Sequence, residues 1–553
     1  MAKPHLKPTV NELYGDAYAR PVTVAESASY AAASHEDQAL VGWYPSSGSA
    51  DSDLLDELDT IVPRARDLDR NSGYVVGARQ AHTDSIIGHQ LGINPNPDRR
   101  ALGWTVEQAD EWSQNVSLQF ESWFNNPLEI DATGMQTGRE LTIQAIAGWF
   151  MNGDHAALPT WRVFPGQRWS TKIQAIEADR IDTPSSMAAQ TRNIRRGIEY
   201  DRQGAIRAIW VRKTHPGDDT GVFGAGYSIS DQFKRIPILT QWGRRRVIFL
   251  LNKERVGQSR GRPLVTAIMR ELRMASHYTR TELQSTIATS LISGVLKSAL
   301  DPDTAQSIFG SMDAQAADEW WRASFAKYAP KLKSGAILQL PLGADFESHN
   351  PNRPNTAFDA FMHSVLTHIS TGLGISYEVL AKDFSRTNYS SARATMLEVW
   401  RYFNGKRAWI EENWLNPIFE LWLEEAVNAG VVDAPNFYEL RFAYSRLSRW
   451  TMAGRGWVDP MKEAGGAALR RRSRITSLKH ECAEQGLDWR EVIDQTQIEE
   501  DYMRKKGIDP MLAESQQVTT DSLDVANDQE QDQGQETDDE QQTEDEQDSE
   551  EQS

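Results

Sequence analysis

Two amphipathic segments that flank residues 293–352 constrain the fold of this chain more than any other feature. In the first, apolar side chains recur at helical spacing, which predicts a helix over 262–292. Pro263 suits its first turn, where a missing N–H has no intrahelical role. A helix of about 29 residues would be ~43 Å long. Its apolar face consists of Leu264, Ile268, Leu272, Leu283, Ile287 and Leu291.

The second segment predicts a helix over 353–375 that ends at Gly372 and Gly374. A polar stretch over 376–390 follows it and predicts a loop. A third helix is expected from about Ser390, and Pro417 should break or kink it.

Composition places most of the chain among soluble globular proteins. Of its 553 residues, 39% are hydrophobic and 25% are charged. The single cysteine, Cys482, excludes an internal disulfide framework and a cysteine-based zinc site. The start of the chain lacks the apolar core of a signal peptide. The most apolar stretches, 141–151 and 287–295, are shorter than the ~20 residues that cross a bilayer, so no membrane partner is expected.

The formal net charge of −19 is distributed very unevenly along the chain. Residues 521–553 hold 15 carboxylates and no Lys or Arg, so the first 520 residues carry only about −4. Few apolar side chains are available there to offset the entropy of ordering. Residues 507–553 are therefore predicted to be a disordered acidic tail.

The remaining pattern predicts a mainly helical α+β protein. Residues 1–60 are polar and are expected to be flexible, and helices are expected over 104–123 and 139–151. The region 161–251 changes to short strand-like runs at 172–176, 198–200, 205–211 and 247–251. Gly204 lies in the predicted turn of a hairpin between the second and third of these runs.

A search for catalytic motifs finds none, so we expect neither an enzyme nor a cofactor or metal. Gly405-Lys406 lacks the other glycine of a phosphate loop, and His480-Glu481 is not part of an H-E-x-x-H motif. Gly257-Gln258-Ser259-Arg260-Gly261 has the spacing of G-x-S-x-G, but we assign no nucleophile elbow in this chain. The glycines at 221, 224 and 226 are in the wrong order for a dinucleotide turn, and Asp51-x-Asp53 has no partner ligands in the sequence.

Three basic clusters are candidates for contact with phosphate. They lie at 195–196, at 244–246, and at Arg470, Arg471, Arg472 and Arg474. Such clusters can bind DNA backbones without sequence preference. They can equally be solvated faces or subunit salt bridges. No reading helix or clearly basic domain indicates sequence-specific DNA binding.

Several short strings, in one order and spacing, resemble the portal proteins of tailed bacteriophages, specifically the lambda-like family. The resemblance covers roughly residues 60–500. The strings are Arg64-x-Arg66-Asp67-Leu68-x-Arg70-Asn71, Gly197-Ile198-Glu199-Tyr200-Asp201-x-x-Gly204-Ala205, Val247-Ile248-Phe249 with Lys253-Glu254-Arg255-x-Gly257-Gln258-x-Arg260-Gly261-x-Pro263, Pro351-Asn352-Arg353-Pro354-Asn355, Gly372-Leu373-Gly374-Ile375-Ser376-Tyr377-Glu378, Asn388-Tyr389-Ser390-Ser391-Ala392-Arg393, and Gly456-Trp457-Val458-Asp459-Pro460.

The resemblance implies a homo-oligomeric ring of about twelve subunits at one vertex of the capsid, in a virion assembled in the host cytoplasm. Double-stranded DNA would pass non-specifically through its channel during packaging and ejection. The implied protein partners are the terminase large subunit, later a head-completion or adaptor protein, and the major capsid and scaffold proteins. The implied parts are a wing (61–261), a first stem helix (262–292), a clip (293–352), a second stem helix (353–375), a channel loop (376–390), wing or tunnel helices (391–454) and a crown (455–506).

This mapping gives specific residues an expected role. The apolar faces of the stem helices would be buried between subunits rather than in one monomer core. Lys382, Arg386 and Asn388 would face the channel, although both cations could instead pair with carboxylates of a neighbouring subunit. The tail could repel DNA, cover the basic crown cluster at 470–474, or serve only solubility.

Two other classes of protein remain as alternatives to a portal protein at this point. One is a head scaffold or minor capsid protein that forms no channel and no closed ring. The other is a nuclease or hydrolase that uses Asp or Glu with a metal, which would require carboxylates and a histidine gathered in one pocket.

Overall fold

The structure, a computed structural model, describes most of the chain in nine stretches. They are 31–33, 37–184, 193–219, 232–291, 295–298, 344–347, 358–446, 448–454 and 460–507. The chain divides into two compact units. The smaller consists of Met1–Glu57 with Glu254–Gln258, and the larger of Leu58–Lys253 with Ser259–Ser553.

The smaller unit has a short capped helix within the region expected to be flexible. The 3-10 turn η2 (Ala31–Ala33) precedes α2 (Ala50–Leu54), whose N-cap Ser49 accepts a hydrogen bond from the backbone N–H of Ser52 at 3.1 Å. Arg255 Nη1 lies 2.6 Å from Asp53 Oδ2. This carboxylate of the Asp51-x-Asp53 pair therefore has an arginine partner, which leaves the pair without the character of a cation site.

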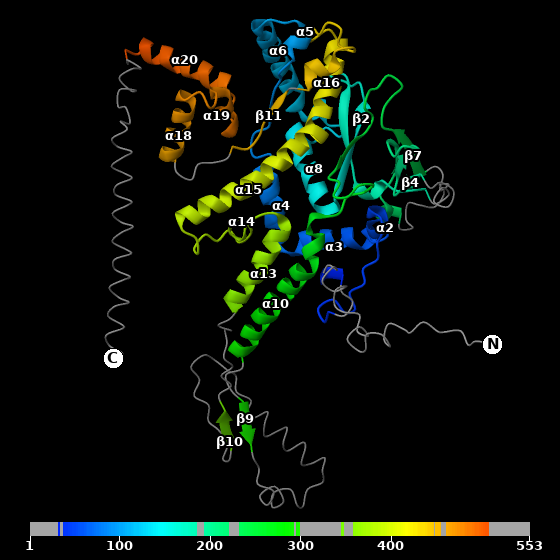
Figure 1. Ribbon diagram of the computed structural model, residues 1–553, viewed down its shortest axis with the longest axis vertical. Helices are drawn as coiled ribbons and strands as arrows, with labels where there is room; N and C mark the ends of the chain where they lie inside the picture. The colour runs from blue at the N-terminus through cyan, green and yellow to red at the C-terminus, as the bar shows by residue number, and fades with distance from the viewer. Residues whose placement is uncertain are drawn as a thin grey trace, which may run out of the picture. The chain divides into compact units, whose positions relative to one another are not determined.

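The larger unit is mainly helical (Figure 1). Its longer helices are α3 (Leu58–Asn71), α4 (Gly73–Ile86), α6 (Val106–Phe124), α8 (Gly138–Asn152), α10 (Met269–Leu291), α13 (Phe358–Leu373), α15 (Tyr389–Ile410), α16 (Asn416–Asn428), α18 (Pro460–Arg472) and α20 (Trp489–Lys505). Its shorter helices are α5 (Arg99–Leu102), α7 (Pro127–Ile130), α14 (Tyr377–Ala381), α17 (Arg441–Ser445) and α19 (Leu478–Glu484). The 3-10 turns are η3 (Ala178–Arg180), η4 (Pro216–Asp219) and η6 (Leu264–Ile268), and η7 (Glu411–Leu415) is π-helical.

The strands form four small antiparallel sheets. The strands are β1 (Gly92–Asn94), β2 (Asp154–Trp161), β3 (Thr171–Ile176), β4 (Ile194–Arg195), β5 (Ile198–Tyr200), β6 (Ile206–Arg212), β7 (Phe233–Pro237), β8 (Ile248–Leu251), β9 (Val295–Ser298), β10 (Ala344–Glu347) and β11 (Arg449–Thr451). The sheet orders are β3-β2-β8, β4-β5-β6-β7, β1-β11 and β9-β10. The expected hairpin is confirmed as β5-β6, with Gly204 at φ +86 in the turn.

Local sequence signals account for the helix starts. Thr105 caps α6 and forms a reciprocal capping box with Gln108, and Thr137 does the same for α8 with Glu140. Each box satisfies two N–H groups that the first helical turn leaves unpaired. Pro417 lies in the first turn of α16, directly after the π-helical turn η7. The expected irregularity at this proline is therefore confirmed.

The core of the larger unit is rich in aromatic side chains from distant segments. Trp123 of α6, Trp414 of η7 and Trp422 of α16 are fully buried. Phe120 contacts Trp422 edge-on, with ring centroids 5.2 Å apart, and such pairs add to the stability that burial of their area provides. A second, smaller cluster lies within the β-rich part and includes Ile198, Ile209 and Val247.

Several expected boundaries need correction. The first long helix begins with the 3-10 turn η6, and only Met269–Leu291 is α-helical. The second ends at Leu373 rather than at residue 375 and is described from Phe358, because residues 353–357 lie outside the described residues. The expected loop at 376–390 contains α14. Of 293–352 only β9 and β10 are described, and the tail from 508 and the glycine cluster at 221–226 lie outside the described residues. Within the described residues, no helix is long and apolar enough to cross a bilayer.

Candidate functional surfaces

The helices α10 and α13 lie side by side and contact each other through aromatic rings (Figure 1). Tyr278 of α10 stacks on Phe358 of α13, with ring centroids 5.5 Å apart, and meets Phe361 edge-on at 5.3 Å. The two segments that the sequence places on either side of 293–352 therefore pair within one chain.

The apolar face of the first helix divides into a buried and an exposed half. Ile268 and Leu272 are 2% and 1% exposed and belong to the core of the larger unit. Leu264 is partly buried against the same core. The expectation that these three side chains are buried between subunits is therefore wrong for Ile268 and Leu272, because the chain's own core covers them.

The other half of the face is exposed in the part of the chain that the structure describes. Leu283 is 60% exposed and Ile287 is 51% exposed. On α13, Phe361 is 52% exposed, whereas Met362, Leu366 and Ile369 are buried. Leu291 ends α10, and nothing about its side chain is described. Apolar side chains that a folded chain leaves exposed next to one another mark a contact surface.

The segment after α13 is a tight, locally bonded turn. Gly374 has φ +70, and a Cβ there would lie 2.9 Å from the Tyr402 ring, so both the backbone and the space favour glycine. Lys382 caps the end of α14 with φ +55, in the left-handed region, and its side chain is exposed. Asp383 accepts hydrogen bonds from Ser385 N at 3.0 Å and Oγ at 2.6 Å. These bonds, led by that of the Ser385 hydroxyl, lower the pKa of Asp383.

The three residues expected to face a channel have different surroundings in the structure. Arg386 forms an ion pair with Asp359 of α13 in its own chain. Asn388 is the N-cap of α15, and its Oδ1 accepts from Ser391 N at 2.8 Å. Of the two cations, Lys382 is the one without a carboxylate partner among the described residues. The structure thus gives Arg386 and Asn388 local roles that the sequence pattern did not reveal.

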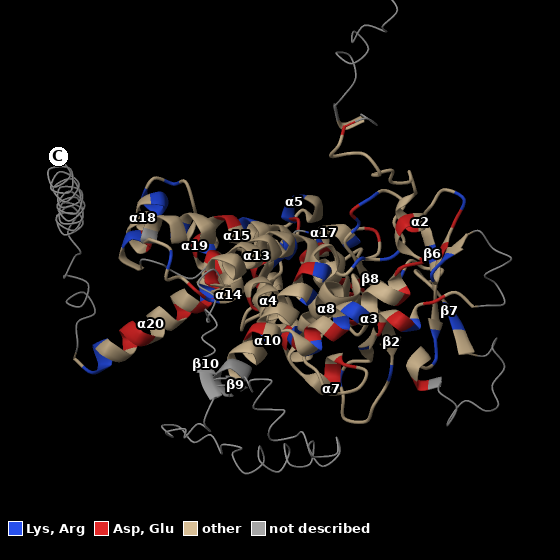
Figure 2. Ribbon diagram, turned by 90° about the horizontal axis from the view of Figure 1, so that it is seen from below, with Lys and Arg blue, Asp and Glu red and all other residues tan. Residues whose placement is uncertain are grey.

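The basic crown cluster lies at the end of α18 and just beyond it (Figure 2). Arg471, Arg472 and Arg474 are exposed, and Arg474 has φ +58. Arg470 makes a bidentate contact with Glu481 of α19, with Nε–Oε1 at 3.0 Å and Nη2–Oε2 at 2.8 Å. One of the four arginines therefore already has an internal carboxylate partner.

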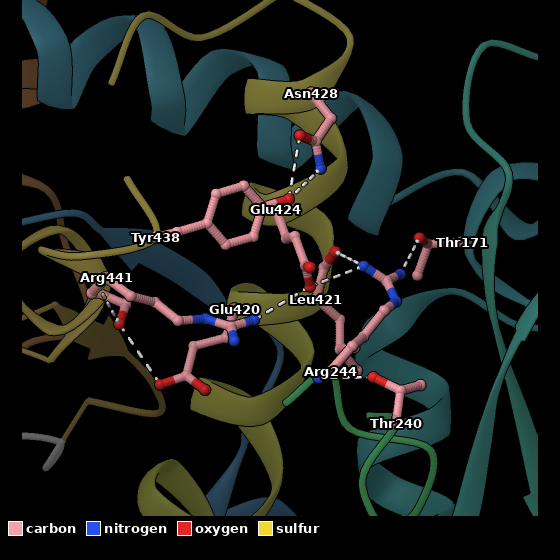
Figure 3. Close-up of polar contacts among 10 residues, drawn as sticks. Thr171, Thr240, Arg244, Glu420, Leu421, Glu424, Asn428, Tyr438 and Arg441 are labelled. Carbon is pink, nitrogen blue, oxygen red and sulfur yellow. Dashed lines mark hydrogen bonds and ion pairs between the residues drawn. The ribbon is translucent and has the colours of Figure 1, made fainter. Parts of the chain in front are cut away.

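The other two basic clusters serve the fold at least in part. Glu424 of α16 is 3% exposed and accepts from Arg244 Nη1 at 2.9 Å and from Arg441 Nη2 at 3.0 Å (Figure 3). Arg244 also donates to Thr171 Oγ1 at 2.8 Å. Arg196 Nη2 lies 2.6 Å from Asp59 Oδ2. Arg244 and Arg196 therefore link separate elements of one chain.

One group of side chains has the composition of a metal site. Oxygen and nitrogen atoms of Glu177, Asp179 and His215 lie within 4.8 Å of one another. Arg66 already forms an ion pair with Asp179. His215 Nδ1 accepts from Gly217 N at 2.9 Å, so the ring proton lies on Nε2, the nitrogen that faces the carboxylates. An arginine and an N–H donor are the wrong partners for a cation, so we assign no ion.

The segment that leads into η6 and α10 is fixed by a buried ion pair that the sequence did not reveal. Arg260 donates from Nε to Asp154 Oδ2 at 2.7 Å and from Nη2 to Asp154 Oδ1 at 3.0 Å. Its remaining donors reach the carbonyl oxygens of Ile181 and Ala178. Every polar part of this buried guanidinium is thus satisfied, as burial requires.

Two glycines beside this pair approach each other closely. Gly153 ends α8 with φ +87. A Cβ on Gly261 would lie 1.8 Å from the carbonyl oxygen of Gly153. Gly261 N donates to Asp154 Oδ2 at 2.8 Å. The Arg260-Gly261-x-Pro263 string is therefore the point where the segment that leads into η6 is fixed to the end of α8.

Comparison with known proteins identifies the family. The sequence matches the phage portal protein, lambda family, over residues 36–407. The portal protein of Escherichia phage N15 is 29% identical over 488 residues, which cover 85% of this chain and 89% of that protein. Portal protein B of Escherichia phage lambda is 28% identical over 485 residues, with the same coverage.

One solved structure matches the chain only at low similarity. A chain from the neck of the native GTA particle computed with C12 symmetry has a TM-score of 0.38 and 12% identity, and the match covers 76% of this chain and 93% of that one. The family assignment comes from the sequence. Because the family match covers more than half of the chain, this protein belongs to the lambda family of phage portal proteins.

Proposed function

We propose that this chain forms a closed ring of about twelve copies at one capsid vertex, with double-stranded DNA passing through its centre during packaging and ejection. Membership of the portal family supports the channel function. That membership also displaces the alternative of a non-channel scaffold or minor capsid protein.

The observation that carries the ring is the exposed half of α10. Leu283 and Ile287 lie on one helix face beyond the last part that the chain's own core covers. Phe361 of the neighbouring helix is exposed as well. A second copy packed against this surface would remove these side chains from water, at roughly 25 cal/mol per Å² of apolar area.

We further assign the parts of the ring as follows. The stem consists of α10 and α13, with residues 293–352 between them as the clip. The β-rich sheets with α3 to α8, α15 and α16 form the wing, and α18 to α20 form the crown. The terminase large subunit and later an adaptor protein would bind the clip, and the capsid and scaffold proteins would contact the ring from outside. Assembly would take place in the host cytoplasm, and the finished ring would lie in the virion.

Lys382 is the proposed channel cation. It is exposed at the end of α14, where the turn to α15 begins, and its ammonium can meet phosphate without fixing sequence. Arg386 and Asn388 support the turn, through Asp359 and the α15 cap respectively. A channel that DNA must traverse requires contacts of this weak, non-specific kind.

The proposal is tested by charge placed in the exposed apolar face. The double substitution Leu283→Asp and Ile287→Asp should prevent rings while leaving folded, soluble subunits, because an ion in an apolar contact is costly only once the contact forms. Gln284→Asp, at an exposed polar position of the same helix, is the control and should still give rings. Sedimentation velocity and negative-stain electron microscopy measure both. Intact rings from the double variant would remove α10 from the subunit contact.

A further inference from the structure

A surface outside the proposed channel combines exposed aromatic side chains with arginines. It is formed by residues 161–168, which follow β2, and residues 239–246, which precede β8. We call it the Trp–Arg surface. Its exposed apolar members are Trp161, Val163, Phe164, Leu239 and Trp242, and its basic members are Arg162, Arg168, Arg244, Arg245 and Arg246.

The pairing of β2 with β8 brings these two loops together. Ala157 lies opposite Ile248 in the antiparallel register. Continued past the ends of the ladder, the same register places Trp161 opposite Arg244. The Arg244 guanidinium carbon does lie 5.7 Å from the centre of the Trp161 ring, within the range of a cation–π contact. The two loops therefore adjoin each other where Arg244 contacts Trp161.

The arginines of this surface have few carboxylates near them with which to form ion pairs. Neither loop contains an Asp or Glu. Arg244 is held by Glu424, but Arg162 reaches only the carbonyl oxygen of Ala132 at 3.1 Å. Arg168 donates to the side-chain oxygen of Gln119 at 2.8 Å.

No ion pair joins a carboxylate to Arg162, Arg168, Arg245 or Arg246 in the part of the chain that the structure describes. Four cationic side chains of these two adjoining loops are thus available to an anionic partner.

The apolar side chains indicate a partner that offers more than charge. Trp161 is 61% exposed and Trp242 is 69% exposed. Tryptophan is one of the largest apolar side chains, so leaving it in contact with water is unfavourable. Exposed Trp together with Arg is the composition of binding hot spots. Duplex DNA presents phosphates but no unstacked base or aliphatic group that would cover these indoles. A peptide that carries both carboxylates and apolar side chains fits the surface better.

The chain itself contains such a segment. Residues 508–553 follow α20 and extend at most about 150 Å. Residues 508–525 of this segment hold six large apolar side chains: Ile508, Met511, Leu512, Val518, Leu523 and Val525. Their last part, 521–553, holds 15 carboxylates and no Lys or Arg. The rival basic site at the crown is less suited, because Glu481 already binds Arg470 there.

We propose that residues 508–553, from the same copy or from a neighbouring copy, dock on the Trp–Arg surface. Apolar side chains near the start of the segment cover Trp161 and Trp242, and carboxylates further along neutralise the arginines. Docking of this kind keeps the acidic segment away from the path of DNA without any need for a basic site at the crown. The inference does not depend on ring formation or on the channel.

The test uses the full-length chain with a photo-reactive side chain on the surface, Trp242→benzoylphenylalanine. Trp242 is exposed, so the change should not affect the melting temperature. After irradiation, mass spectrometry should find cross-links to residues 508–553. Arg245→Glu with Arg246→Glu in the same chain should reduce their yield at least about fivefold, and so should 0.5 M salt, which shortens the range of charge interactions to a few Å. Arg471→Glu with Arg472→Glu is the matched crown control and should leave the yield unchanged.

A second probe position guards against unspecific capture. Leu118→benzoylphenylalanine lies on α6, where the side chain is 68% exposed, and should give no cross-link to the segment. A mixture of light and isotope-labelled chains distinguishes docking within a copy from docking between copies, and either result supports the proposal. Cross-links from Trp242 to another region of a neighbouring copy would overturn it by making the surface a subunit contact. Cross-links to added duplex DNA, no cross-link at all, or a loss caused only by the crown variant would also overturn it.

Discussion

Arg260 and Asp154 lie 106 residues apart in the sequence and form a bidentate ion pair in which neither side chain has appreciable contact with water. The pair fixes the entry of the stem segment to the end of α8. Removing one partner would leave the other charge buried and uncompensated, and such changes typically cost about 3–5 kcal/mol.

We therefore expect Asp154→Asn to lower the free energy of unfolding by several kcal/mol. Arg504→Ala, which removes one partner of the exposed pair with Glu500, is the matched control and should cost less than about 1 kcal/mol. Urea titration followed by circular dichroism measures both. Similar losses in the two variants would show that the buried pair is not a structural anchor.

The two halves of the first stem helix should respond differently to truncation. Leu272→Ala removes a side chain that is 1% exposed, so it should cost about 2–5 kcal/mol of subunit stability. Leu283→Ala removes a side chain that is 60% exposed and should change the stability of the isolated subunit by no more than about 0.5 kcal/mol. Thermal unfolding of unassembled subunits tests this order. A larger loss for Leu283→Ala would contradict the division of the helix.

Lowering the pH should reduce the stability of the fold, because the buried His82 must then take up a proton. His82 Nδ1 lies 2.7 Å from the carbonyl oxygen of Ala78, and Nε2 lies 3.2 Å from that of Leu373, the last residue of α13. Burial lowers the pKa of His82 to about 4, with Lys406 a minor contributor, against 6.5 in the unfolded chain. The unfolded state thus binds the proton first as the pH falls.

The stability that the neutral imidazole confers is therefore present above pH 6.5 and is lost as the pH falls toward 4. The lowered pKa of His82 corresponds to about 3 kcal/mol in the free energy of unfolding. His82→Gln should have a smaller decrease in melting temperature between pH 7 and pH 4.5 than the unchanged protein. His155, whose pKa burial also lowers to about 4, should account for part of the dependence that remains. Parallel curves for the two proteins would assign the acid sensitivity to other groups.

A partly buried carboxylate, that of Glu121, should reduce the stability of the fold at high pH. Glu121 of α6 lies in a cavity of about 580 Å³ with Asp488 and Glu491 at the start of α20. Burial in the first place, and the nearby carboxylates in the second, raise the pKa of Glu121. Its charged form is therefore disfavoured in the folded state.

Glu121→Gln should stabilise the protein above that raised pKa and have little effect below it, where the glutamate is protonated anyway. We expect a gain of less than about 1 kcal/mol at pH 8, because water screens the charge in part. Scanning calorimetry at pH 8 and pH 4 measures the difference. A loss of stability at pH 8 would mean that the carboxylate makes a favourable contact in its charged form.

The channel role of Lys382 can be separated from its backbone role. Asn tolerates the left-handed region that Lys382 occupies, so Lys382→Asn removes the charge with little strain. Lys382→Arg retains the charge. We expect rings from both variants, and DNA packaging or retention altered only by Lys382→Asn. Equal packaging and retention in all three proteins would exclude this ammonium from contact with DNA.

Periodicity in the sequence predicted which segments are helical, but it could not predict what covers each helix face. Leu272 and Leu283 belong to the same apolar pattern, and only the fold shows that the first meets the core and the second does not. The strand β2 was missed because Pro159 interrupts its pattern. The family strings placed Arg260 and Gly261 correctly in sequence, but their partners Asp154 and Gly153 follow from tertiary pairing alone.

For the candidate surfaces, too, the sequence identified the residues but not their tertiary partners. The sequence identified Arg386 and the cluster at 244–246 as basic. Asp359 and Glu424, which bind Arg386 and Arg244, lie far away along the chain and carry no local signal. The exposure of Trp161 and Trp242 likewise could not be read from a chain whose other tryptophans largely build the core.

The division of α10 has a consequence for the order of events in a cell. Because the chain covers Ile268 and Leu272 by itself, a newly made copy can reach its folded state alone. In the proposed ring, a neighbouring copy would cover the exposed side chains beyond them, such as Leu283, so the rate of ring formation would depend steeply on how many copies have accumulated. Supply of the chain, and not its folding, would then set how many rings are nucleated in each infected host.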